Sequence, residues 1–107
     1  MYIRIQDQAI RFRVSKDEAE KIIAGEVLSS SIALSINVKL IYLIQIIDGE
    51  NQFKYEERNN EIHISVNREK LVNELFNGPS KKGIVFNHAI AKQTISVSLE
   101  INVKKIR

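Results

Sequence analysis

The sequence predicts an α+β fold in which eight strands and two short helices form one mostly antiparallel sheet or a closed barrel. Apolar and polar residues alternate with a period of two over many short segments, which is typical of half-buried strands. Two segments carry helix start and stop signals. The order strand-strand-helix-strand-strand occurs twice along the chain, so each half contributes the same kinds of element.

The clearest local pattern lies between residues 10 and 25. Apolar residues alternate with arginines over residues 10–14, which predicts a strand with one apolar and one cationic face. Ser15 and Glu18 have the S-x-x-E spacing of a capping box, in which each side chain bonds the other residue's backbone amide. Gly25 can adopt the left-handed conformation that ends a helix. A helix over residues 16–24 is therefore predicted.

The rest of the first half reads as three further strands. They are predicted at residues 3–5, 28–36 and 39–47, with Leu34 and Ile36 on the apolar face of the second of these. The segment 39–47 is apolar at both odd and even positions. Such a strand is expected to be central and covered on both faces.

The second half follows the same plan. Strands are predicted at residues 53–55, 62–66, 83–88 and 95–103. Asn67 is a candidate N-cap for a second helix, which the segment Asn77-Gly78-Pro79 ends. The apolar positions of this helix have helical spacing and include Leu71, Val72, Leu75 and Phe76.

A shift of 52 positions aligns the two halves, so that strand falls on strand and helix cap on helix cap. We therefore interpret residues 1–107 as a single domain of two pseudo-repeats, 1–50 and 51–103. Each repeat is expected to form a one-sided sheet that its partner covers. The alternative is a chance recurrence of hairpins and short helices. The predicted shared core contains Phe12, Val14, Ile44, Ile64, Leu75 and Leu99.

The composition is that of an ordinary globular protein. The chain has 107 residues, of which 44% are hydrophobic and 27% charged, and it contains no cysteine. No segment has the length and apolarity of a signal peptide or membrane helix, so we expect a cytoplasmic protein without a membrane partner. The net charge of +3 permits an anionic partner but is equally consistent with solubility alone.

Three arginines are the best candidate for a functional site. Arg4, Arg11 and Arg13 occupy the parity opposite the apolar residues of their strands, so pairing of these strands would gather them on one face. Guanidinium groups placed in this way suit a phosphate or carboxylate, which they bind bidentately. The alternative is a solvated surface partly neutralised by acidic residues of the second half, namely Glu56, Glu57 and Glu61.

Other chemistry has weaker support in the sequence. His63 and His88 lack partners at metal-binding spacing, so we expect neither a metal site nor a cofactor. Glu61, His63 and Ser65 share one strand face, but a row of this kind is usually ordinary polar surface. Phe12, Phe53 and Tyr55 share the apolar parity of their strands, which leaves no obvious stacking platform for bases, so nucleic acid is not expected as a partner. We predict no catalytic residue.

The opening of the chain resembles a known protein family. Met1-x-Ile3-Arg4-Ile5, followed by the segment from Ile10 to Glu18 and by Gly25, is similar to a family of small uncharacterised bacterial proteins. The resemblance implies the same fold and supplies no activity. The element order also resembles the tunnel-shaped triphosphate-binding enzymes of the CYTH type. Those enzymes begin with E-x-E-x-K, whereas Tyr2-Ile3-Arg4-Ile5-Gln6 contains no acid.

These observations favour a small non-enzymatic binding or interaction module over an enzyme. The alternative is an anion-binding protein, or a divergent CYTH-like phosphohydrolase, that uses the face of Arg4, Arg11 and Arg13. The expected partner in either case is an anionic small molecule or an acidic protein surface.

Overall fold

A computed structural model describes residues 1–49, 53–78 and 83–102. These residues form eight strands and two helices. The elements are β1 (Tyr2–Gln6), β2 (Ala9–Ser15), α1 (Lys16–Ile23), β3 (Leu28–Ala33), β4 (Lys39–Ile47), β5 (Phe53–Arg58), β6 (Glu61–Asn67), α2 (Arg68–Asn77), β7 (Ile84–Ile90) and β8 (Gln93–Asn102).

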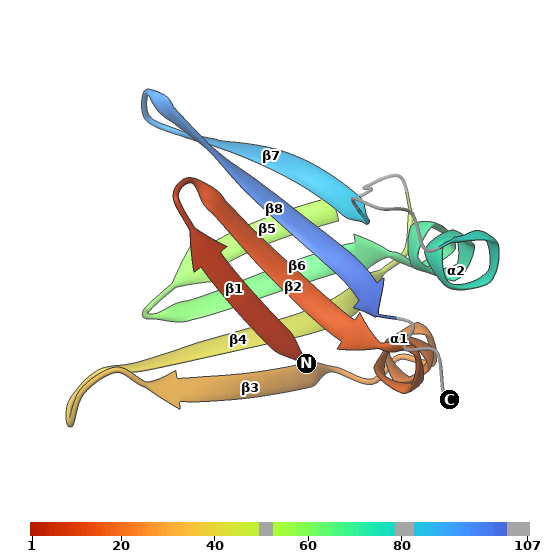
Figure 1. Cartoon of the computed structure of the whole chain (residues 1–107), viewed down its shortest axis with the longest axis horizontal. Helices are drawn as coiled ribbons and strands as arrows, with labels where there is room; N and C mark the ends of the chain where they lie inside the picture. Colours follow the sequence, from red (N-terminus) through yellow and green to blue (C-terminus); the bar gives the residue numbers. More distant parts are fainter. Residues whose placement is uncertain (50–52, 79–82, 103–107) are drawn as a thin grey trace.

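The strands form two four-stranded sheets, with the orders β1-β2-β8-β7 and β3-β4-β6-β5. The sheets are stacked face to face, and both helices lie at the same end of the stack (Figure 1). The prediction of one eight-stranded sheet or a closed barrel is therefore wrong. The two-sheet arrangement arises because each sheet joins two hairpins through one central parallel pair, β2 with β8 and β4 with β6. Sequence periodicity detects hairpins but not how hairpins combine.

Each half of the chain contributes one hairpin to each sheet. The hairpins β1–β2 and β3–β4 lie in different sheets, as do β5–β6 and β7–β8. The expectation that each half forms its own sheet is therefore wrong. The reason is that the parallel central pairs connect strands from different halves.

The hairpins β1–β2 and β5–β6 have matched registers. Arg4 lies opposite Arg11, and 52 positions later Glu56 lies opposite His63. The hairpins β3–β4 and β7–β8 do not keep this shift, since Ile44 lies opposite Leu28 but Ser96, 52 positions later, lies opposite Asn87. The internal duplication stays a prediction that only the first pair of registers supports. Its proposed boundary at residues 50 and 51, and Val103 at its end, lie outside the described residues.

Both helices begin at the predicted caps. Ser15 and Glu18 form the complete capping box, with the Glu18 amide donating to Ser15 Oγ at 3.1 Å. At the end of α1, the amide of Gly25 donates to the Ile22 carbonyl, and Gly25 has a φ of 103°. Asn67 caps α2 by accepting from the Lys70 amide. In the described parts of the chain, neither helix has the length and apolar character that crossing a bilayer requires.

Arg68, the first residue of α2, contacts the end of α1 and the residue that follows β4. Its guanidinium donates to the carbonyl of Ile23, at the end of α1, and pairs with Asp48, just after β4. The distance from Arg68 Nε to Asp48 Oδ1 is 2.9 Å. This bond to Arg68 lowers the pKa of the Asp48 carboxyl. The ion pair and the hydrogen bond together tie the first residue of α2 to two segments of the first half.

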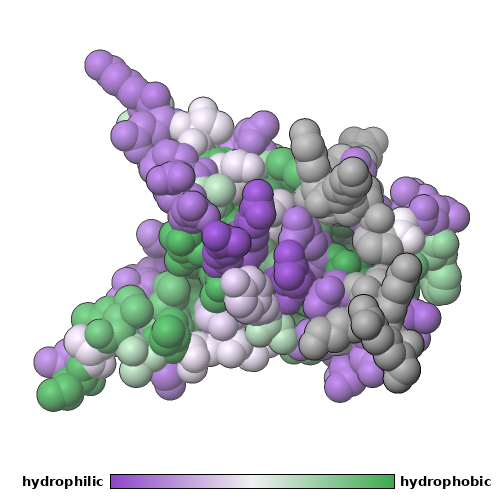
Figure 2. Space-filling view, in the orientation of Figure 1, coloured by the Kyte–Doolittle hydropathy of each residue, from purple (hydrophilic) through white to green (hydrophobic). Residues whose placement is uncertain are grey.

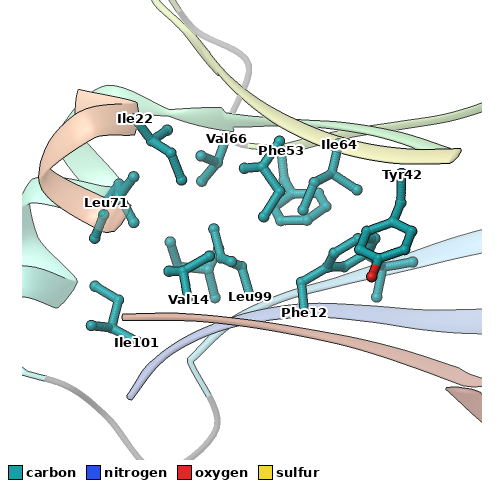
Figure 3. Close-up of a cluster of buried hydrophobic side chains, with 14 of the residues drawn as sticks. Phe12, Val14, Ile22, Tyr42, Phe53, Ile64, Val66, Leu71, Leu99 and Ile101 are labelled. Atoms are coloured by element: carbon teal, nitrogen blue, oxygen red, sulfur yellow. The ribbon is translucent and has the colours of Figure 1, made fainter. Parts of the chain in front are cut away.

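The core lies between the two sheets and is closed at one end by the helices. Figure 3 shows Phe12, Val14 and Leu99 pointing from one sheet toward Ile64 and Val66 of the other. The aromatic rings of Phe12 and Tyr42 meet edge to face, with centroids 6.2 Å apart. All six residues of the predicted core are buried: Phe12, Val14, Ile44, Ile64, Leu75 and Leu99. This part of the prediction is confirmed.

Three predictions about apolar residues are wrong. Strand β3 ends at Ala33, so Leu34 and Ile36 lie in an exposed turn instead of a strand. Phe76 is also exposed, because α2 buries only its Leu71 side. The outward face of β4 stays half-buried, since the helices lie at the end of the stack and not over this face (Figure 1).

Candidate functional site

The three arginines share one outward face of the β1-β2-β8-β7 sheet. Arg4 comes from β1, and Arg11 and Arg13 come from β2, where they alternate with buried apolar residues. The antiparallel register places Arg4 directly opposite Arg11. Together with Tyr2 and Glu100 they line a hollow of about 40 Å³. The sequence-predicted cluster is thus spatially assembled.

Arg13 already has partners in this hollow. Its Nη2 lies 3.3 Å from Glu100 Oε2, and its guanidinium carbon lies 5.9 Å from the centre of the Tyr2 ring. The sequence reasoning missed Tyr2 and Glu100. Tyr2 has the same parity as Arg4 and was detectable from that pattern. Glu100 was not detectable, because it reaches Arg13 only through the parallel pairing of β2 with β8.

Arg4 and Arg11 differ from Arg13 in their surroundings. Among the residues that the structure describes, neither forms an ion pair with a carboxylate. Like charges directly opposite each other on neighbouring strands repel. The neighbour of Arg11 on its other side is Ser98, which is 7% exposed and can offer a hydroxyl group. This part of the face therefore combines two unpaired cations with a neutral hydrogen-bonding group.

The acidic residues expected to neutralise the arginines lie elsewhere. Glu56, Glu57 and Glu61 belong to β5 and β6, in the other sheet. Glu56 and Glu61 alternate with the inward apolar residues of their strands, so they point away from the arginines on the far side of the stack. That part of the alternative interpretation is wrong, because it assumed that both halves shared one sheet face.

A larger hollow adjoins the arginine face beside the start of α1. It has a volume of about 280 Å³ and shares Tyr2 and Arg13 with the smaller one. Its remaining lining residues are Met1, Val14, Ser15, Glu18 and Asn102. The two hollows therefore offer one cationic compartment and one mixed apolar and polar compartment side by side.

Glu18 is the acidic group of the larger hollow. Its Oε2 accepts a hydrogen bond from the amino group of Met1 at 2.5 Å. Partial burial raises the pKa of Glu18, but the bonds from Met1 and Ser15 outweigh this and leave the pKa below its ordinary value of 4.5. Glu18 is thus held as a carboxylate that is already satisfied by the protein.

The histidines lie apart from the arginine face. His63 Nε2 lies 2.8 Å from Glu61 Oε1 on the outward face of β6. Ser65 Oγ instead accepts a hydrogen bond from Gln45, at 3.0 Å. His88 packs among aromatic rings, with its centroid 5.2 Å from that of Tyr55. Within the described residues, no group of three His, Asp, Glu or Cys side chains is placed to hold a metal ion.

Comparison with known proteins places the chain in a family. Comparison with curated proteins and with solved structures gives no match. A family model matches residues 1–105, which is nearly the whole chain. The chain therefore belongs to DUF7009, a family of unknown function.

Proposed function

We propose that this protein is a small binding module that holds a compact anionic group, phosphate or carboxylate, between Arg4 and Arg11. The observation that carries the proposal is the direct opposition of these two residues, with neither paired to a carboxylate among the described residues. A like-charge pair in this position destabilises the sheet. An anion bound between the two guanidinium groups relieves this repulsion and accepts charge-assisted hydrogen bonds from both.

The geometry suits recognition of an anion more than chemistry on it. Each guanidinium presents paired donors that match two oxygens of a carboxylate or phosphate. Glu100 neutralises Arg13, which leaves the net positive charge of the hollow on Arg4 and Arg11. The carboxylate of Glu100 also repels a second anion, so the site favours one compact group.

The adjoining larger hollow supports a ligand with an organic part beside the anionic group. Met1 and Tyr2 supply apolar surface there, and Ser15 and Asn102 supply polar contacts. Ligand sites commonly combine apolar walls with a small number of placed polar groups. An acidic side chain on a partner protein presents the same carboxylate chemistry and belongs to the same proposal.

The proposal is tested by titrating the ¹⁵N-labelled protein with inorganic phosphate and with acetate, against chloride at equal ionic strength. We expect saturable shifts in the amide signals of Arg4, Arg11 and their strand neighbours. The variant Arg4→Gln/Arg11→Gln should lose these shifts and keep its fold. The matched control Arg58→Gln/Lys92→Gln removes two exposed cations that do not line the hollow and should keep these shifts.

Two results would refute the anion site. One is that phosphate, acetate and chloride give equal, unsaturated shifts. The other is that the Arg4→Gln/Arg11→Gln variant responds to phosphate in the same way as the unmodified protein.

A further inference from the structure

The β3–β4 hairpin exposes apolar residues that the described chain does not cover. Ile32 is 50% exposed, Leu34 is 61% exposed and Ile36 is fully exposed. In Figure 2, hydrophobic side chains gather over the projecting end of this hairpin, at the lower left, whereas the projecting end of β7–β8 is hydrophilic. Clustered exposed apolar residues of this kind mark an interaction surface.

The end of the hairpin is a built turn. The amides of Leu34 and Ser35 both donate to the Val38 carbonyl, at 2.8 and 3.1 Å. The Val38 amide in return donates to Ser35 Oγ at 3.1 Å. These bonds fix the backbone of the turn that follows β3, so less backbone freedom is lost when a partner covers this end of the hairpin.

Strand β3 is also an edge strand without charge. Within the described residues it pairs only with β4, and its sequence Leu-Ser-Ser-Ser-Ile-Ala contains no charged residue or proline. The edge strands β1 and β5 carry charged residues, which discourage pairing with another chain. Strand β7 has no Lys, Arg, Asp or Glu, but the turn after it contains the charged residue Lys92. Among the edge strands of the described residues, β3 alone combines an uncharged edge with an apolar end.

We infer that β3 pairs antiparallel with β3 of a second copy of this chain, about a two-fold axis at Ser30. The pairing joins two β3-β4-β6-β5 sheets into one continuous sheet. Ser30 then lies opposite Ser30 of the second copy, and Leu28 lies opposite Ile32 of the second copy. The exposed side chain of Ile32 is covered in this way, and the open edge of β3 gains a backbone partner.

Self-complementarity is the reason that the occupant is a second copy. The register pairs an apolar residue with an apolar residue and serine with serine on the same strand face, as an isologous interface requires. Between residues 26 and 47 the only charged residues are Glu26 and Lys39, and they flank β3 on opposite sides. In the antiparallel arrangement Glu26 of one copy lies at the end of β3 near Ala33 of the other copy, whose partner on β4 is Lys39, so each end of the interface holds charges of opposite sign.

This interface is independent of the proposed anion site. It uses the edge of the β3-β4-β6-β5 sheet, whereas Arg4 and Arg11 lie in the other sheet. Loss of phosphate binding and loss of dimerisation are therefore separately measurable.

Engineered cysteines give the most direct test, because the chain has no cysteine of its own. Directly opposed residues of antiparallel strands have Cα atoms about 4.5 or 5.5 Å apart, within the range of about 4.4–6.8 Å for a disulfide. We expect Ser30→Cys to form a covalent dimer under mild oxidation. The control Ser31→Cys should not, because residue 31 lies opposite Ser29 of the second copy and only diagonally across from residue 31 of that copy. Absence of the Ser30→Cys dimer, or a Ser31→Cys dimer of equal yield, overturns the inference.

Sedimentation equilibrium between about 1 and 100 µM tests the same interface without a crosslink. The unmodified protein should be a dimer, and Ser29→Lys/Ser31→Lys should raise the dissociation constant at least about tenfold, because each new lysine faces a lysine of the second copy. The matched variant Val85→Lys/Asn87→Lys, on the β7 edge, should remain dimeric. A monomeric unmodified protein overturns the inference. So do equal effects of the two variants, or growth into higher oligomers.

Discussion

Replacement of Ser15 by alanine tests how much the capping box at the start of α1 contributes to stability. The Ser15 hydroxyl accepts from the Glu18 amide at 3.1 Å, and the Ser15 amide donates to Glu18 Oε1 at 2.9 Å. The substitution removes only the first of these bonds, because the second uses the backbone of residue 15. The amide of Glu18 then loses its acceptor in the protein.

The expected cost follows from this geometry. Loss of an N-cap side chain costs about 0.5–2 kcal/mol. This helix start is exposed, so water partly replaces the hydroxyl, and the reciprocal bond survives. We therefore expect a loss near the middle of the range, about 1 kcal/mol, or roughly 4 °C in melting temperature for a chain of this size.

Urea unfolding measures this loss as a shift in midpoint at unchanged slope. The matched control is Ser15→Asn, because asparagine is the residue that caps α2 at the equivalent place and can keep the acceptor. We expect it to lose no more than a few tenths of a kcal/mol. Equal losses for alanine and asparagine, or no loss for alanine, would refute the role assigned to the Ser15 hydroxyl.

Two further predictions concern the same helix start and the core. Because the pKa of Glu18 is lowered in the folded state, its carboxylate stabilises the fold above pH 4.5, and this contribution disappears as the pH falls through the folded pKa. The difference in unfolding free energy between the unmodified protein and Glu18→Gln should therefore shrink below pH 4.5 in a urea series, and a pH-independent difference would contradict this. In the core, Phe12→Ala should cost about 3–5 kcal/mol in urea unfolding, whereas Phe76→Ala should cost less than about 0.5 kcal/mol. Similar losses at the two positions would show that exposure does not govern the cost.

The local structure could be predicted from the sequence because its determinants are neighbours along the chain. The alternation around Phe12 fixes which face of β2 is buried, and the spacing of Ser15 and Glu18 fixes the start of α1. The shared parity of Arg4 and Arg11 likewise placed them on one face. Each of these inferences needs no knowledge of a distant segment.

The arrangement of the hairpins could not be predicted in the same way. The pairing of Arg13 with Glu100 depends on a parallel contact between strands far apart in the chain, which no local spacing encodes. The position of Glu56 on the other side of the stack depends on the same connections. The exposed turn around Ile36 was mistaken for strand because apolar parity continues past the last paired residue, Ala33.

The pairing of β2 with β8 also sets an order of events during synthesis. Arg13 and its partner Glu100 are separated by 87 residues, so at about 5–20 residues per second the ribosome delivers β8 on the order of ten seconds after β2. The hairpin β1–β2 is only marginally stable during this interval, and one side of β2 has no strand to pair with. Arg11 and Arg13 lie along that open side, where positive charge disfavours association with other nascent chains. Strand β8, made after the other seven described strands, thus completes the sheet that carries the arginines.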